Sequence, residues 1–234
     1  MKDNLDSSII GNRKIVIELR FEPIVSILDK KGLIAEKLEK LKLFATNHWE
    51  IRQGDVTIMD SNERETSTNF IMVSFTRISY ISSNISSISD YYSKFEKIYN
   101  CLTEIISKPV ITRIGCRILG SYKVKSTDYD DILKHFLESF PKKYILEPYI
   151  ANDLAFNLVY ENGMYKIGPV KTDDPFYANE FPGDKTNHHI GICIDTDNYV
   201  TNVVRDIKDK SLIKDIFQLS LSVEKNLYTN LCDF

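Results

Sequence analysis

Residues 13–23 read RKIVIELRFEP, and this stretch decides the start of the fold. Apolar residues such as Ile15 and Ile17 alternate with a set that includes the charged Arg20, which is the period of a strand with one buried face. Pro23 ends this strand because proline cannot donate a hydrogen bond to a neighbouring strand. The sequence therefore predicts a half-buried strand whose second face carries charge.

A second stretch near the middle of the chain, ITRIGCRILGSYKV (111–124), has the same character. By alternation, Arg113 and Arg117 share one face of this strand with Gly115. We expect the two arginine-bearing strands to be equivalent and to lie side by side at the centre of one sheet.

The remaining elements follow from helical and strand periods. Helical spacing covers about 24–44, where Gly32 is a candidate break, and Ser89 is placed to cap a later helix. The dipeptide Asn-Gly in ENGM (161–164) indicates a hairpin. The other expected strands are 48–60, 68–81, 111–119, 144–150, 153–160, 164–170 and 188–197, and the other expected helices are a stretch marked by Tyr92 to Ile106, 129–140 and 211–231.

Both parts of the chain therefore read strand, helix, two or three strands, helix. This order predicts an α+β fold with a mainly antiparallel sheet and helices packed on one face. We expect two pseudo-repeated halves with the element order of ferredoxin-like folds. Residues 1–12 would be a flexible N-terminus, and the halves 13–108 and 109–234 would form one compact unit.

The composition limits the classes of function. The chain has 234 residues, of which 43% are apolar, enough for a sizeable core. A formal net charge of −3 argues against a general duplex-binding domain, since such domains usually have a basic surplus. The chain shows neither a secretory signal nor an apolar run long enough to span a bilayer. The four cysteines are scattered, so we expect a soluble, cytoplasmic protein without disulfides.

Three motifs resemble a sporadically distributed prokaryotic family of uncharacterised proteins. IVIELRFEP (15–23) is similar to the opening E-I-R-F strand of that family, and ITRIGCRILG (111–120) to its central R-I-G-L-R-Y-I-N strand. GICIDTD (191–197) with the final helix resembles its D-x-D strand and closing helix. Cys116 stands where the family has leucine. The family has no assigned activity, so the resemblance implies an architecture and a prokaryotic origin.

The arginines Arg20, Arg113 and Arg117 admit two interpretations. In the first, Glu18 and Glu22 face Arg113 and Arg117 across the sheet in a ladder of cross-strand ion pairs, each contributing about 0.2–1 kcal/mol. In the second, the arginines form an anion-binding surface, because the planar guanidinium suits phosphate and carboxylate. The nearby glutamates and the ordinary occurrence of charge on an exposed sheet face favour ion pairing.

Histidine chemistry has little support in the spacing. His188 and His189 are adjacent, so a regular strand points them to opposite faces and they cannot both bind one metal. They are the candidates for acid–base catalysis, although a solvated pair is the favoured interpretation. His48 and His135 are isolated in the sequence.

Other catalytic patterns are missing from the sequence. Asp195 and Asp197 in DTDN (195–198) lack the glycine and distant glutamate of a calcium loop, and we interpret them as a turn. The chain has no G-x-S-x-G motif, no P-loop and no G-x-G-x-x-G motif. We therefore expect neither a metal nor another cofactor.

These patterns favour a non-catalytic binding, interaction or regulatory module over an enzyme. Exposed sheet edges would suit a protein partner or a homodimer. Binding of RNA or another polyanion through the arginines and neighbouring tyrosines is the alternative. A metal-independent RNA-cleaving or hydrolytic enzyme using His188 or His189 is the third hypothesis.

Overall fold

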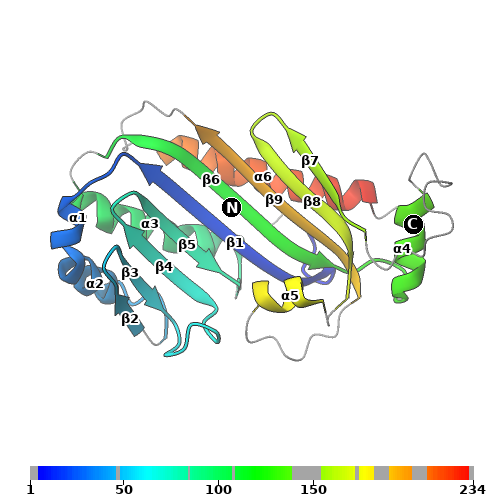
Figure 1. Cartoon of the computed structure of the whole chain (residues 1–234), viewed down its shortest axis with the longest axis horizontal. Coiled ribbons are helices and arrows are strands. Elements are labelled where there is room, and N and C mark those ends of the chain that lie inside the picture. Colours follow the sequence, from blue (N-terminus) through cyan, green and yellow to red (C-terminus); the bar gives the residue numbers. More distant parts are fainter. Residues whose placement is uncertain are drawn as a thin grey trace.

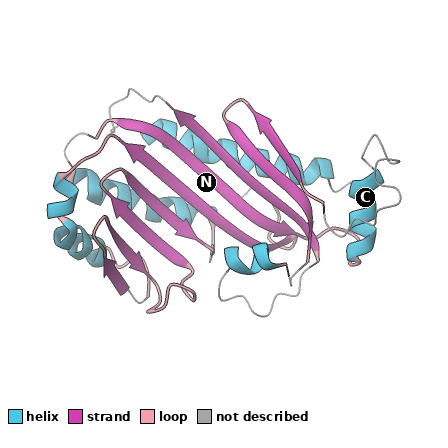
Figure 2. Cartoon of the chain, in the orientation of Figure 1, coloured by secondary structure: helices cyan, strands magenta, loops and turns pink. Residues whose placement is uncertain are grey.

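The computed structural model describes residues 5–45, 48–83, 85–106, 109–138, 154–171, 174–181, 190–201 and 210–231. Within these residues the chain has an α+β fold, in which six helices accompany a single antiparallel sheet of nine strands (Figures 1 and 2). Across the sheet the strand order is β2-β3-β4-β5-β1-β6-β9-β8-β7.

The strands are β1 (Ile10–Phe21), β2 (His48–Ile51), β3 (Asp55–Met59), β4 (Asn69–Ser74), β5 (Arg77–Ser82), β6 (Ile111–Tyr122), β7 (Phe156–Tyr160), β8 (Gly163–Val170) and β9 (Gly191–Thr201). The helices are α1 (Ser26–Asp29), α2 (Lys31–Lys40), α3 (Ile88–Ile105), α4 (Tyr129–Glu138), α5 (Pro175–Glu180) and α6 (Lys210–Leu231).

The two longest strands, β1 and β6, pair at the centre of the sheet and run antiparallel (Figure 1). Their register sets Ile17 opposite Cys116, Glu18 opposite Gly115 and Arg20 opposite Arg113. The expected central pairing of the two arginine-bearing strands is therefore confirmed.

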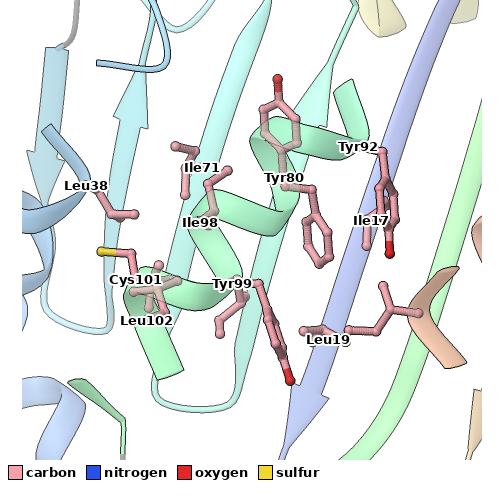
Figure 3. Packing of buried hydrophobic residues seen from close by; sticks show 14 of the residues in the cluster. Ile17, Leu19, Leu38, Ile71, Tyr80, Tyr92, Ile98, Tyr99, Cys101 and Leu102 are labelled. Atoms are coloured by element: carbon pink, nitrogen blue, oxygen red, sulfur yellow. The ribbon is translucent and has the colours of Figure 1, made fainter. Parts of the chain in front are cut away.

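The main core lies between the sheet and helices α2, α3 and α6. Ile15, Ile17 and Leu19 of β1 are buried on this side, as the alternation predicted. Figure 3 shows Ile17 and Leu19 beside aromatic residues of the same core. The hydroxyl of Tyr91 in α3 donates to the carbonyl oxygens of Ile15, at 3.2 Å, and Tyr80, at 2.9 Å. Burial of apolar area, at about 25 cal/mol per Å², holds helix and sheet together. The two hydrogen bonds of the Tyr91 hydroxyl fix the position of α3 over β1 and β5.

A second core cluster lies at the end of the sheet near α4. Ile132 and Phe136 of α4 pack with residues of β8 and β9, including Ile167 and Ile192. The ring of Phe136 stacks on that of Phe156 in β7, with centroids 6.0 Å apart. This cluster anchors one end of the β7–β8 hairpin.

Two expected strands are hairpins instead. The stretch 48–60 forms β2 and β3 around a turn that contains Gly54, and 68–81 forms β4 and β5 around Phe75 and Thr76. The second turn has no glycine, proline or asparagine to mark it, so the sequence has the composition of one continuous strand from 68 to 81.

Several boundaries also differ from expectation. The break between α1 and α2 falls at Lys30, and Gly32 lies inside α2. Ser87, not Ser89, caps α3, because its side chain accepts a hydrogen bond from the Asp90 amide at 3.0 Å. β1 begins at Ile10, earlier than expected, and the expected strand 144–150 lies outside the described residues.

Not all helices pack on one face of the sheet, which corrects the expected layering. The short helix α5 falls in a stretch that the sequence indicated to be a polar loop, and it packs on the face opposite α3 and α6. Phe181 at its end is buried with Leu119, Val170 and Cys193. Within the described residues, no helix has the length and apolar character required to cross a bilayer.

A buried charge network joins the centre of the sheet to α6. Glu224 of α6 is fully buried and accepts hydrogen bonds from the Arg13 guanidinium of β1 and the Tyr122 hydroxyl of β6. Gly120 makes room for this arrangement, since a Cβ atom there would overlap the Tyr122 phenol. The network fixes α6 against both central strands.

Replacing Glu224 tests how much this network contributes to the free energy of unfolding. Glu224→Gln leaves the buried Arg13 guanidinium facing a neutral amide, and breaking a buried ion pair costs about 3 kcal/mol. We expect the free energy of unfolding, measured by urea denaturation, to fall by about that amount. The control Glu36→Gln removes an exposed pair with Lys40 and should leave the midpoint unchanged. Equal midpoints for the two variants would show that the network adds nothing.

Candidate functional site

Charged side chains of four neighbouring strands, β5, β1, β6 and β9, meet on the face of the sheet opposite α3 and α6. Because side chains alternate along strands, charged residues at every second position share this face. We call it the charged face and define it by Arg77 of β5, Lys14, Glu18 and Arg20 of β1, Arg113 and Arg117 of β6, and Asp195 and Asp197 of β9.

Arg113 lies across the sheet rather than projecting from it. Its guanidinium covers Gly115, where a Cβ atom would lie 3.0 Å from Nη1. From there it contacts Glu18 of β1 at 3.3 Å and Asp197 of β9 at 2.8 Å. It also lies 4.7 Å from the ring centroid of Tyr199, a cation–π distance. Gly115 therefore lets one guanidinium join three strands.

Arg117 forms a bidentate ion pair on this face. Its Nε and Nη2 atoms donate to the two carboxylate oxygens of Asp195, each at 2.8 Å, in a two-pronged arrangement. Nη2 also contacts Glu180 of α5 at 3.3 Å. The hydrogen bond to Asp195 raises the pKa of Arg117 against the opposing effect of burial.

Glu180 ties α5 to the charged face. Its carboxylate accepts a hydrogen bond from Lys14 at 2.9 Å in addition to the contact with Arg117. Burial alone would raise the pKa of Glu180, but Lys14 and Arg117 outweigh it, so the pKa lies below its usual value. For Asp197 the balance is reversed: burial raises the pKa and the Arg113 charge offsets only part of that rise.

At the other end of the charged face, three guanidiniums surround one carboxylate. Glu18 accepts from Arg20 at 2.6 Å and Arg113 at 3.3 Å, and it lies 3.8 Å from Arg77 of β5. The register sets Arg20 directly opposite both Arg77 and Arg113. Arg113 is shared with Asp197, whereas the Arg20 side chain is 52% exposed. This end of the face is therefore locally cationic.

These contacts show which of the expected ion pairs form. Arg20 and Arg113 do come together with Glu18, but Glu22 lies beyond β1 and is exposed. The turn expected at Asp195 and Asp197 is wrong, because both residues lie inside β9 and face the arginines. The strand continues because each aspartate is neutralised by a guanidinium on β6.

The two histidines within the described residues, His48 and His135, do not gather in one site. His188 and His189 lie outside the described residues. His48 is in β2, while His135 in α4 lies edge-on to Phe136. Across the described part of the chain, no three side chains among His, Cys, Asp and Glu gather as metal ligands.

The thiols in the described part of the chain are poor nucleophiles. Cys101, Cys116 and Cys193 are free and buried. Burial raises the pKa of Cys116 and of Cys193 to about 12, so both are thiols, not thiolates, at neutral pH.

Two hollows flank Arg117 and Asp197 on the charged face. One of about 340 Å³ extends over β1 and is lined by Glu18, Arg20 and Arg113. The other, of about 420 Å³, extends toward β7 and β8, where Val159 and Met164 line it. The second hollow combines paired charges with exposed apolar side chains.

The β7–β8 hairpin contains the apolar residues that the sequence interpretation missed. The exposed fractions are 41% for Leu158, 77% for Val159, 66% for Tyr160 and 55% for Met164. We call these four residues the β7 edge. The signal was present, because LVY (158–160) is apolar at three consecutive positions and lacks the alternation of a half-buried strand.

Comparison of the chain with protein-family models and with curated proteins finds no match.

The contacts of Glu180 predict a pH-dependent stability. A carboxylate whose folded pKa is depressed stabilises the fold above its unfolded pKa, here about 4.5, and this contribution disappears as the pH falls through the folded value. Glu180→Gln should lower the free energy of unfolding by roughly 1 kcal/mol at pH 7 and by less as the pH falls below 4.5.

Thermal melts of wild type and variant across this pH range measure the difference. Glu22→Gln, at an exposed carboxylate, is the control. A difference between wild type and Glu180→Gln that is constant with pH would contradict the assigned role of the charge.

Proposed function

We propose that this chain is a non-catalytic binding module that acts by docking another protein at the β7 edge and the adjoining hollow. The observation that carries the proposal is the set of exposed apolar side chains on the outer hairpin of the described sheet, of which Val159 and Met164 lie on the charged face beside the paired Arg117 and Asp195. Exposed apolar clusters bordered by polar groups are typical of protein interaction surfaces.

The gain from docking comes from burying apolar area. Val159 and Met164 are more exposed than buried, and full burial of such a side chain contributes about 1.5–3 kcal/mol. Arg117 and Asp195 are already paired, so a partner does not have to neutralise an isolated charge. The paired charges would orient a partner, while the apolar residues would supply most of the affinity.

The chemistry of the charged face supports binding better than catalysis. Its guanidiniums are engaged by carboxylates, and the buried thiols of Cys116 and Cys193 are protonated at neutral pH. A prokaryotic origin, and membership of the family that the three motifs resemble, belong to the same proposal.

The pseudo-repeat belongs to the proposal as well. Outward from the centre, one side of the sheet runs β1, β5, β4, β3, β2 and the other runs β6, β9, β8, β7. On each side the innermost strand comes first in the chain and its neighbour comes last. This order supports two related halves, with β1 and β6 as equivalent strands.

One feature favours polyanion binding, including RNA, as a second candidate function. Arg20, Arg77 and Arg113 share Glu18 at the locally cationic end of the charged face. The exposed guanidiniums of Arg20 and Arg77 could donate to phosphate oxygens.

Capture from a prokaryotic host tests protein docking. We expect tagged wild type to recover a specific partner, and Val159→Lys to lose it because a charge on the apolar edge opposes burial. Leu219→Lys is the matched control, since Leu219 is an exposed apolar residue of α6, on the helix-covered side of the sheet. Equal recovery by wild type and Val159→Lys would refute docking at the β7 edge.

Filter binding of single-stranded RNA across a salt series tests the second candidate. Phosphate contacts release counterions, so affinity should fall steeply between about 50 and 200 mM salt. The double variant Arg20→Gln, Arg77→Gln should reduce both the affinity and the salt slope. The control Arg52→Gln, at an exposed arginine just beyond β2, should change neither. Weak binding that does not respond to salt would reject this candidate.

A further inference from the structure

The two ends of the sheet differ in how their outer strands are protected. β2 is a four-residue strand with a glutamate, Glu50, which pairs with Arg52 at 2.9 Å just beyond the strand. β7 has five residues and no charged side chain among them. Charges blunt an edge strand against pairing with another chain. By this criterion, of the two outermost strands in the part of the chain that the structure describes, β2 is protected and β7 is open to strand addition.

The hairpin register fixes which backbone groups of β7 point outward. Tyr160 pairs with Gly163 across a two-residue turn, and Leu158 pairs with Tyr165. In such a hairpin the residues flanking the turn exchange hydrogen bonds, and the outward direction alternates along the strand. The N–H and C=O groups of Asn157 and Val159 are therefore directed away from β8, toward the outer edge of the described sheet.

This pattern is self-complementary in one antiparallel register. A two-fold axis at Leu158 sets Asn157 of each copy opposite Val159 of the other copy. Each outward N–H then meets an outward C=O of the second copy. The same axis sets Leu158 opposite Leu158, and Phe156 opposite Tyr160, on one face of the joined strands. Aromatic and aliphatic cross-strand pairs are favourable, and β7 carries no like charges to repel one another.

We propose that the partner docked at β7 is a second copy of this chain, bound by antiparallel β7–β7 pairing about an axis at Leu158. This inference rests on the proposed function, because it names the occupant of the β7 edge. Two nine-stranded sheets would become one continuous sheet with a charged face on each side of the axis. Val159 of the second copy would then lie next to Asn157 and extend the wall of the 420 Å³ hollow.

Molar mass in solution tests the inference on the full chain. We expect wild type to have twice the 27.1 kDa mass of one chain, and to dissociate on dilution. Val159→Pro removes an outward N–H that β8 does not use, so it should raise the dissociation constant at least tenfold while circular dichroism is retained. Val159→Thr keeps the N–H and the branched shape and should remain dimeric.

Disulfide cross-linking provides a second test, which does not depend on whether the proline variant folds. In this register Leu158 and its counterpart form a non-hydrogen-bonded pair, whose Cα atoms lie about 4.5 Å apart, within the range of about 4.4–6.8 Å that a disulfide spans. Leu158→Cys should form a covalent dimer under mild oxidation, whereas wild type and Leu219→Cys should not.

The outcomes separate this inference from the proposed function. A monomer at every concentration, with no cross-link in Leu158→Cys, overturns the second copy as partner and leaves docking of a different protein to the capture experiment. A dimer that persists in Val159→Pro, and that Leu158→Cys does not cross-link, uses another surface and also overturns it. A dimer lost in Val159→Pro and cross-linked through Leu158→Cys supports it.

Discussion

The antiparallel pairing of β1 with β6 is the constraint on which the rest of the structure depends. It joins the two parts of the chain in one sheet and sets Glu18 opposite Gly115. Because the glycine has no side chain, the Arg113 guanidinium can lie between Glu18 and Asp197. On the other face, the same pairing sets Arg13 and Tyr122 within reach of Glu224. One backbone register thus positions charge networks on both sides of the sheet.

The two networks have different physical roles. The buried one couples α6 to the sheet, and losing one of its partners would leave a charge in an apolar environment. On the charged face the ion pairs are partly exposed, and such pairs stabilise proteins only weakly. Their effect is to neutralise the arginines and hold their orientation. This neutralisation is the basis of the docking role that we propose for the face.

The sequence predicted the parts of the fold that depend on local period. The strands at Ile15 and Arg113, their central pairing and the long final helix follow from alternation and helical spacing. The turn at Phe75 was missed because no turn residue marks it, and α5 was missed because its position depends on Glu180 and Phe181 meeting distant strands. Asp195 and Asp197 were misread because their partners, Arg117 and Arg113, are 78 and 84 residues away in the chain. Local pattern carries no information about such partners, although glycine between the two arginines in RIGCR was a readable hint that a side chain crosses the strand there.

The protein is one platform in which two surfaces, the charged face and the β7 edge, are held in a fixed relation by β1 and β6. Native-state hydrogen exchange tests this most directly. We expect the amides of residues 15–19 and 114–118 to exchange only through global unfolding, with one shared free energy, because both strands are central and their apolar side chains are buried. Exchange of one of these strands at a distinctly lower free energy than the other would mean that the parts of the chain open independently, and it would contradict a single platform.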